Sequence, residues 1–205
     1  MMNNPSFVYS REKMESITVI VDLFTHKLSY WQDGKRIRTL KIAVGKPATP
    51  SPIGVWHVMA KYQGWGGGFG THFLALDVPW GIYGIHGTNK PNLVGKSVSL
   101  GCIRMRNEDV NWLYHHVNIQ DCIIIEGNPL GHAYRLPRHL AEGERGSDVL
   151  LVQNRLRAGG WYQGRQDGIF ADDLLLAVLR FQRKMHVPVD GMIDRDDYLV
   201  LGLLE

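Results

Sequence analysis

Two short stretches decide the interpretation of this chain, Ile85-His86-Gly87-Thr88-Asn89 and Ser99-Leu100-Gly101-Cys102-Ile103-Arg104-Met105. His86 and Cys102 are separated by 102 − 86 = 16 residues. The apolar segment from Gly81 to Ile85, which leads into the histidine, has the length of a short β-strand. Gly101 allows the backbone to turn tightly before the cysteine. We therefore expect a mainly β domain around the pair.

The sequence on the N-terminal side of this pair alternates with the period of two that is typical of strands. Ile17, Val19 and Val21 fall on one side of such a strand. Leu28 to Gln32, Asp33-Gly34 and Lys35 to Val44 form a predicted hairpin, because Asp-Gly tolerates the positive φ angles of a two-residue turn. Further strands are expected over residues 55–60, 73–78 and 122–126, and the prolines of Thr49-Pro50-Ser51-Pro52-Ile53-Gly54 interrupt the sheet. The expected fold class is a β-sandwich or distorted barrel.

One helix is expected inside this β region, after the cysteine stretch. Asn107 is its predicted cap, with Glu108 and Asp109 in the first turn. Its buried stripe is expected to contain Val110, Leu113, Tyr114 and Val117. Residues 64–70, five glycines around Trp65 and Phe69, predict a flexible loop near a site.

The C-terminal part changes from strand to helix periodicity. Residues 128–142 are rich in Pro, Gly, His and Arg and predict a linker. A small α-helical domain is expected over residues 143–205, with two inward faces made of Val149, Val152 and Leu156 and of Leu174, Ala177, Val178 and Phe181. Asp167-Gly168-Ile169-Phe170 recurs as Asp190-Gly191-Met192-Ile193, 190 − 167 = 23 residues later, which indicates an internal repeat.

Composition narrows the classes of function. The 205 residues carry a net charge of +3, and no basic cluster with interleaved aromatic residues suggests nucleic-acid binding. No apolar run approaches the roughly 20 residues of a membrane span. The run from Ile17 to Val21 is too short for a signal-peptide core, so no export signal is expected. Cys102 and Cys122 allow at most one disulfide, and Cys122 is expected to be a buried, inert thiol.

Cys102 and His86 are the residue types that acyl transfer from an amide requires. A free thiol with a pKa of about 8.5 is only a few per cent thiolate at neutral pH. A histidine with a pKa of about 6.5 can take the thiol proton and return it to the leaving amine. The N–H groups of Gly101 and Cys102 are candidate oxyanion donors, and Ser99 is expected to brace the turn by hydrogen bonding. The Arg104 guanidinium is expected to bind a substrate carboxylate.

The two stretches resemble the signature of the YkuD-type L,D-transpeptidase family, a histidine in a His-Gly context followed by Ser-x-Gly-Cys and often Ile-Arg-Met. The resemblance covers residues 16–127, because the proline-rich turn and the glycine-rich loop also match family features. It implies a YkuD-like catalytic domain in which the carbonyl of Gly87 orients His86. Many members carry a second histidine directly before the Gly-Cys pair, whereas this chain has Leu100. Any role of that histidine in holding the oxyanion or thiolate is therefore absent.

The same resemblance implies a ping-pong reaction on peptidoglycan. Cys102 is expected to attack the diamino acid at position three of a tetrapeptide stem, release D-alanine, and pass the acyl group to an amine of a second stem. Donor and acceptor stems are the implied partners, and carbapenem-type inhibitors are expected to acylate Cys102. No metal or organic cofactor is needed. Residues 143–205 resemble the helical peptidoglycan-binding domain family, except that Ala171-Asp172-Asp173-Leu174 replaces its usual Gly-x-x-Thr.

Several alternatives remain open. Water in place of the amine makes the enzyme an L,D-carboxypeptidase, and a dead transpeptidase fold makes the chain a non-catalytic cell-wall-binding protein. A zinc site at His115-His116 is disfavoured, because adjacent helical residues point about 100° apart. The expected location is the cell envelope or cell wall, with the spore envelope as an alternative.

Overall fold

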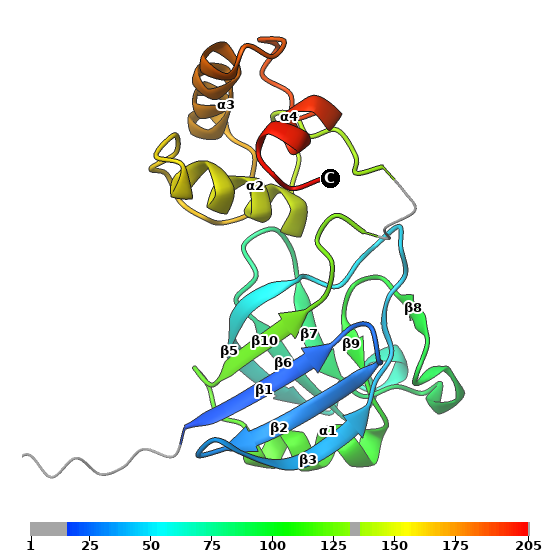
Figure 1. Cartoon of the computed structure of the whole chain (residues 1–205). Helices are drawn as coiled ribbons and strands as arrows, with labels where there is room; N and C mark the ends of the chain where they lie inside the picture. Colours follow the sequence, from blue (N-terminus) through cyan, green and yellow to red (C-terminus); the bar gives the residue numbers. More distant parts are fainter. Residues whose placement is uncertain (1–15, 132–135, 205) are drawn as a thin grey trace, which may run out of the picture.

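The computed structural model describes residues 16–131 and 136–204, and Figure 1 shows a β part that lies below a helical part. The helical part contains α2 (Ser147–Ala158), α3 (Asp172–Met185) and α4 (Arg195–Val200). The β part contains β1 (Ile17–Asp22), β2 (Lys27–Gln32), β3 (Lys35–Lys41), β4 (Val44–Gly45), β5 (Gly54–Gln63), β6 (His72–Leu76), β7 (Tyr83–His86), β8 (Ser97–Ser99), β9 (Ile103–Arg104), α1 (Asn107–His116) and β10 (Cys122–Glu126), with short 3-10 turns at Gly67–Phe69 and Pro91–Leu93.

One curled sheet forms most of the described β part, with eight strands in the order β3-β2-β1-β10-β5-β6-β7-β9. β1 and β10 lie side by side as a parallel pair, with Val19 opposite Ile123. The alternation predicted for the first strand is confirmed, because Val19 and Val21 are fully buried. The mainly β prediction is confirmed in its distorted-barrel form, and so is the small helical part.

β2 and β3 form the hairpin predicted from Asp33-Gly34. Both turn residues have positive φ, at 49° and 75°, as a two-residue turn requires. The predicted second strand, Lys35 to Val44, is too long, because β3 ends at Lys41. Ala43 instead exchanges two backbone hydrogen bonds, of 2.7 and 2.8 Å, with Arg104. The chain thereby leaves the hairpin and supports the strand that follows the cysteine.

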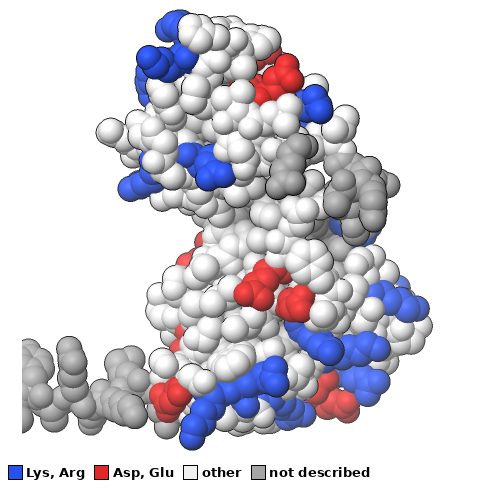
Figure 2. Space-filling model, in the orientation of Figure 1, with Lys and Arg blue, Asp and Glu red and all other residues white. Residues whose placement is uncertain are grey.

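β3 is one edge of the sheet, and its exposed side chains include several basic residues. These are Lys35, Arg36, Arg38 and Lys41. Figure 2 shows Lys and Arg gathered over the lower part of the molecule, where β2 and β3 lie in Figure 1. Charged side chains on an edge strand discourage pairing with another sheet. The open edge of the curled sheet is therefore protected.

α1 packs on β6 and β7. Val110 and Leu113, with Val117 directly after the helix, are fully buried, as the predicted stripe requires. The prediction that Asn107 caps this helix is wrong, because Arg106 occupies the cap position and makes no side-chain capping bond. The side chain of Asn107 turns instead toward two neighbouring loops.

The helical part has an apolar core of its own. Both predicted inward faces are confirmed, because the following residues are buried: Val149, Val152, Leu156, Leu174, Ala177, Val178 and Phe181. α4 begins with a capping box formed by Asp194 and Asp197. Leu140, which precedes α2, is fully buried and forms a β-bridge with Ile193. The segment before α2 is therefore part of this core.

The predicted internal repeat has a structural counterpart in two buried glutamines. Gln153 bonds to the three residues of Asp167-Gly168-Ile169 at 3.0, 2.7 and 3.0 Å. Gln182 bonds to the three residues of Asp190-Gly191-Met192 at 3.1, 2.9 and 2.7 Å. In both copies the amide nitrogen donates to the aspartate and to the last carbonyl, and the amide oxygen accepts from the glycine N–H. Each Asp-Gly turn is thus fixed to the helix before it.

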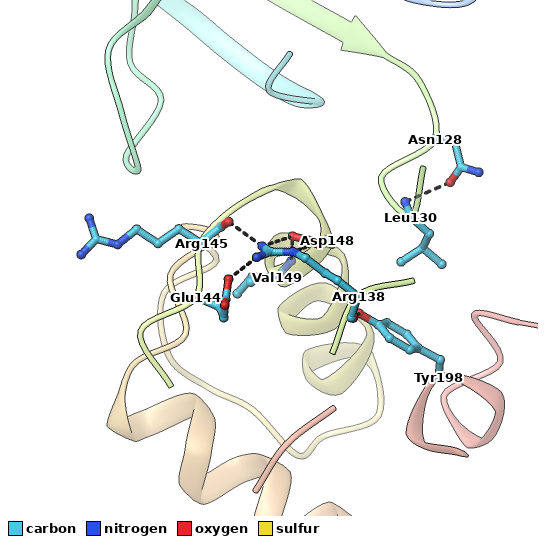
Figure 3. Close-up of polar contacts among 8 residues, drawn as sticks. All are labelled: Asn128, Leu130, Arg138, Glu144, Arg145, Asp148, Val149 and Tyr198. Carbon is cyan, nitrogen blue, oxygen red and sulfur yellow. Dashed lines mark hydrogen bonds and ion pairs between the residues drawn. The ribbon is translucent and has the colours of Figure 1, made fainter. Parts of the chain in front are cut away.

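Arg138 ties the segment before α2 to the start of that helix (Figure 3). Its guanidinium donates to both carboxylate oxygens of Asp148, at 2.6 and 3.1 Å, and also to Glu144 and to the carbonyl of Arg145. The hydrogen bond to Asp148 is the main cause that raises the pKa of Arg138. Arg138 lies in the predicted linker, residues 128–142, of which 132–135 lie outside the described residues. The proposed domain boundaries stay a prediction, but this end of the segment is fixed to the helical part.

Candidate active site

Strands β7 and β9 bring the two halves of the sequence signature together. They run parallel, with Ile85 opposite Ile103 and His86 opposite Arg104. Cys102 is the residue directly before β9. Two residues that are 102 − 86 = 16 positions apart in the sequence therefore lie at two paired strands, His86 at the end of β7 and Cys102 directly before β9.

The His86 ring is buried, and the backbone of Gly87 and of Phe69 hydrogen-bonds to it. Nδ1 lies 2.6 Å from the carbonyl oxygen of Gly87. Since a carbonyl only accepts, Nδ1 carries the hydrogen and Nε2 is the basic nitrogen. Phe73 stacks on the ring with centroids 5.6 Å apart, and Phe69 contacts it at 5.1 Å. Burial lowers the pKa of His86 to about 4, so the ring is neutral at pH 7.

Asn107 holds the loop that carries Gly87, a contact that the sequence reasoning missed. Its Oδ1 accepts the N–H of Thr88 at 3.1 Å and the N–H of Thr71 at 3.3 Å. A Cβ on Gly70 or on Gly87 would lie 2.2 Å from this oxygen. Any side chain at either glycine would therefore displace the amide. The sequence signal was weak, because an asparagine at a helix start is more simply read as a cap.

Ser99 organises the turn that contains Cys102. Its hydroxyl donates to the Cys102 carbonyl at 2.6 Å and accepts the N–H of Gly101 at 3.0 Å. Thr49, from the proline-rich turn, donates to the Ser99 carbonyl at 3.0 Å. These contacts brace the turn. The Gly101 N–H, predicted as an oxyanion donor, is occupied by Ser99 in this structure, which leaves the Cys102 N–H as the candidate donor.

Tyr83 and the carbonyl of Ile82 border Cys102, and no sequence pattern pointed to either. The Cys102 sulfur lies 3.9 Å from the Ile82 oxygen. Gly101 has a φ of +118°, and a Cβ there would lie 2.7 Å from the Tyr83 ring. Burial raises the pKa of the Cys102 thiol, and the backbone of Gly84 acts in the opposite direction. The resting site therefore contains a neutral thiol and a neutral imidazole.

Arg104 lies on β9, two residues after Cys102. Its Nε is buried, and no hydrogen-bond partner reaches this nitrogen from the part of the chain that the structure describes. Its positive charge adds to the effect of burial that lowers the pKa of His86. The same charge opposes the effect of burial that raises the pKa of Cys102. A buried donor without a partner is costly, and a ligand carboxylate would satisfy it. This geometry suits the carboxylate-binding role predicted for Arg104.

Cys122 and the exposed Leu100 add no further contact to the site around Cys102 and His86. Cys122 is a free thiol on β10 that is only partly buried, and Cys102 is also free. Leu100, the residue directly before the Gly-Cys pair, is 71% exposed.

Within residues 16–131 and 136–204, no group of three or more His, Cys, Asp or Glu side chains is arranged to hold a metal ion. None of the helices in these ranges is long and apolar enough to cross a membrane.

A pocket of about 590 Å³ opens beside the loop that follows His86. It is lined by Thr88, Asn89, Pro91, Asn92, Arg106, Asn107 and Glu108. Neither Cys102 nor His86 lines it, so the pocket does not contain the predicted reactive pair.

Two family models match the chain. Residues 16–125 match the model described as "L,D-transpeptidase catalytic domain". Residues 145–196 match the model described as "Putative peptidoglycan binding domain". The two ranges correspond to the β part and to the helical part.

Similar proteins include bacterial L,D-transpeptidases. "Putative L,D-transpeptidase YkuD" of Bacillus subtilis is 40% identical over 92 residues, which are 45% of this chain and 55% of that protein. "Putative L,D-transpeptidase YqjB" of the same organism is 33% identical over 122 residues, with 52% of this chain and 69% of that protein covered. A solved structure, "L,D-transpeptidase from Mycobacterium smegmatis", has 25% identity and a TM-score of 0.48, and covers 55% of this chain and 59% of its own. The match spans about half the length of the YkuD relatives.

Proposed function

Because this chain belongs to the L,D-transpeptidase catalytic domain family, we propose that it transfers acyl groups between peptide stems of peptidoglycan, with Cys102 as nucleophile and His86 as base. The observation that carries the proposal is the pairing of β7 with β9, because β7 ends at His86 and Cys102 directly precedes β9. The contact between Nδ1 of His86 and the Gly87 carbonyl, which orients the ring, supports it. The match of residues 145–196 to a wall-binding model supports a wall substrate.

In the first half-reaction, the Cys102 sulfur attacks the carbonyl of the diamino acid at position three of a tetrapeptide stem. Nε2 of His86 takes the thiol proton during this attack, because a buried thiol and a buried imidazole do not favour a separated ion pair at rest. The Cys102 N–H donates to the developing oxyanion. His86 then returns the proton to the leaving nitrogen, D-alanine departs, and a thioester remains on the enzyme.

In the second half-reaction, the side-chain amine of a second stem attacks the thioester. His86 accepts a proton from this amine, and the sulfur is protonated again as the thioester carbon–sulfur bond breaks. The product is an amide between two position-three residues. Arg104 binds a carboxylate of a stem through its guanidinium. The protein acts in this proposal at the cell wall, in the cell envelope.

Incubation of the full chain with defined tetrapeptide muropeptides, followed by mass spectrometry, tests the proposal. We expect free D-alanine and dimers that are linked through position three. Cys102→Ala should abolish both products and also the mass adduct with a carbapenem, whereas the matched variant Cys122→Ala should retain all three. Tripeptide monomers without dimers would identify an L,D-carboxypeptidase. Carbapenem adducts on Cys122 would overturn the nucleophile assignment.

Pelleting with purified sacculi tests the wall-binding part of the proposal. The full chain is expected to sediment with sacculi, and competition by soluble muropeptides should reduce the bound fraction. The departure at Ala171-Asp172-Asp173-Leu174 makes this a separate question from catalysis. If the protein cross-links muropeptides but stays in the supernatant, the enzymatic proposal stands and the proposed wall binding by the helical part is refuted.

A further inference from the structure

The helical part contacts the β part through a small set of residues. The Ser147 hydroxyl, in the first turn of α2, accepts the N–H of Ile53 at 2.8 Å. Leu150, in the same helix, packs against the core of the sheet. Gly168, in the first Asp-Gly turn, lies against the Trp80 ring. Figure 1 shows α2 as the helix nearest to the β part.

The contact at Gly168 leaves no room for a side chain. Gly168 has a φ of +70°, and a Cβ there would lie 2.4 Å from Cζ3 of Trp80. The equivalent glycine of the second repeat, Gly191, has a φ of +78° and the same bond to a buried glutamine. A Cβ on Gly191 would meet Leu175, a flexible side chain of the helical part itself. Of the two equivalent turns, the first therefore faces the catalytic domain.

The residues at this contact are held as one rigid corner. The Gly146 N–H donates to the Gly168 carbonyl at 2.9 Å, which joins the start of α2 to the first Asp-Gly turn. Arg138 binds Asp148, Glu144 and the Arg145 carbonyl on either side of Gly146 (Figure 3). A displacement of the turn would therefore move the start of α2 with it.

A continuous series of contacts leads from this corner to the nucleophile. Trp80 meets Tyr83 edge to face, with ring centroids 6.5 Å apart, and meets Trp56 in the same way at 5.1 Å. The Tyr83 ring fills the space beside Gly101. The carbonyl of Ile82, between Trp80 and Tyr83 in sequence, is 3.9 Å from the Cys102 sulfur.

We propose that the Asp167-Gly168 turn is a docking element, and that its contact makes Trp80 a positioning residue for Cys102. The docked turn fixes the position of Trp80, and Trp80 fixes the segment that contains Ile82 and Tyr83. This segment borders the Cys102 thiol. The helical part then contributes to the geometry of the active site as well as to binding the wall. The proposal rests on the proposed function only in taking Cys102 as the nucleophile.

The matched pair Gly168→Ala and Gly191→Ala tests this in the full chain, with Cys122→Ser as the common background. Both alanines enter the same left-handed backbone, but only the first meets Trp80, and its Cβ would also lie 2.9 Å from the Gly146 carbonyl oxygen. Two quantities are measured. Hydrogen exchange of the Ile53 amide reports docking, because this N–H is bonded to Ser147. The rate of Cys102 alkylation by iodoacetamide across pH reports the surroundings of the thiol.

We expect Gly168→Ala to accelerate Ile53 exchange, to shift the pH profile of alkylation, and to slow acylation by a carbapenem roughly tenfold, since small displacements at a reacting group are costly. Gly191→Ala should leave all three within about twofold of the parent. In a Trp80→Ala background, Gly168→Ala should have no additional effect on alkylation, because the two changes act through one contact.

Equal effects of the two alanines, or an unchanged Ile53 exchange in Gly168→Ala, would overturn the docking element. Faster Ile53 exchange with an unaltered alkylation profile would overturn the positioning role of Trp80. If Gly168→Ala unfolds the helical part, Leu150→Lys, with the exposed Leu176→Lys as its control, provides the same comparison. Failure of the wild-type chain to release D-alanine would refute the proposed function. Hydrogen exchange at Ile53 and alkylation of Cys102 would still decide the docking proposal.

Discussion

The buried imidazole of His86 predicts how the stability of the folded chain depends on pH. Burial lowers the pKa of His86 from 6.5 to about 4 in the folded state. Between these values the unfolded chain binds a proton at His86 and the folded chain does not. The free energy of unfolding should therefore fall as the pH decreases from about 6.5 to about 4, and His86 should have no effect on its slope above that window.

The magnitude follows from the two pKa values. At about 1.4 kcal/mol per tenfold difference in proton affinity, the loss is roughly 2 kcal/mol at pH 5 and roughly 3 kcal/mol at pH 4. The perturbation is His86→Gln, which removes the titrating group. Urea unfolding of both proteins, followed by tryptophan fluorescence, measures the difference. Five of the six tryptophans lie in the β part, so this signal reports the unit that contains His86: Trp31, Trp56, Trp65, Trp80 and Trp112.

The quantity to compare is the stability of the wild type minus that of the variant at each pH. Asp197, whose pKa burial raises to about 6, titrates in both proteins and cancels in this difference. Leu113→Ala, which opens a cavity in the same core, is the control, since its difference from the wild type should not depend on pH. A His86→Gln difference that changes by less than about 0.5 kcal/mol between pH 7 and pH 4.5 would refute the lowered pKa.

Three further outcomes follow from the site and from the repeat. Asn107→Ala should lower kcat for D-alanine release roughly a hundredfold, because it frees the loop that orients His86; unchanged kcat in steady-state assays would show that this loop is held without the amide. Arg104→Lys should raise KM for a tetrapeptide roughly tenfold with a smaller change in kcat, and equal KM values would exclude carboxylate binding there. Gln182→Leu should cost roughly 2 kcal/mol or more in the unfolding of the helical part, because it leaves the Gly191 N–H without its buried acceptor; calorimetry with an unchanged transition would contradict this.

Strand positions could be predicted from the sequence where burial alternates locally. Val19 and Val21 are inward because one face of β1 meets the core, and this periodicity is visible in six residues. The same alternation of apolar residues predicted that the second hairpin strand reaches Val44, although β3 ends at Lys41. The alternation of burial ends there, because Ile42, Ala43 and Val44 are all buried, and the hydrogen-bond partner of Ala43 is Arg104, far away in the sequence. Pairing partners of this kind leave no local signal.

The family to which the β part belongs could be predicted because the motifs around His86 and Cys102 are compact, while the residues that contact these motifs in the fold could not. Cys102 and His86 each stand in a short recognisable context. Tyr83 and Asn107 act through glycines that come close to them only in the fold, Gly101 in one case and Gly87 in the other. Glycine is required at these positions because a neighbouring side chain occupies the place of a Cβ, and the sequence does not identify that neighbour.

The central position of β10 has a consequence for the synthesis of the chain. β10 lies between β1 and β5 in the eight-stranded sheet, so the strand groups β3-β2-β1 and β5-β6-β7-β9 pair into one sheet through β10. β10 begins 122 − 22 = 100 residues after β1 ends, which a ribosome translates in roughly 5 to 20 seconds. During that interval the nascent chain exposes two unpaired strand edges, β1 and β5, which are templates for aggregation. We therefore expect chains that stop before residue 122 to be insoluble and to depend on chaperones, and chains that include residue 126 to close the sheet as they leave the ribosome.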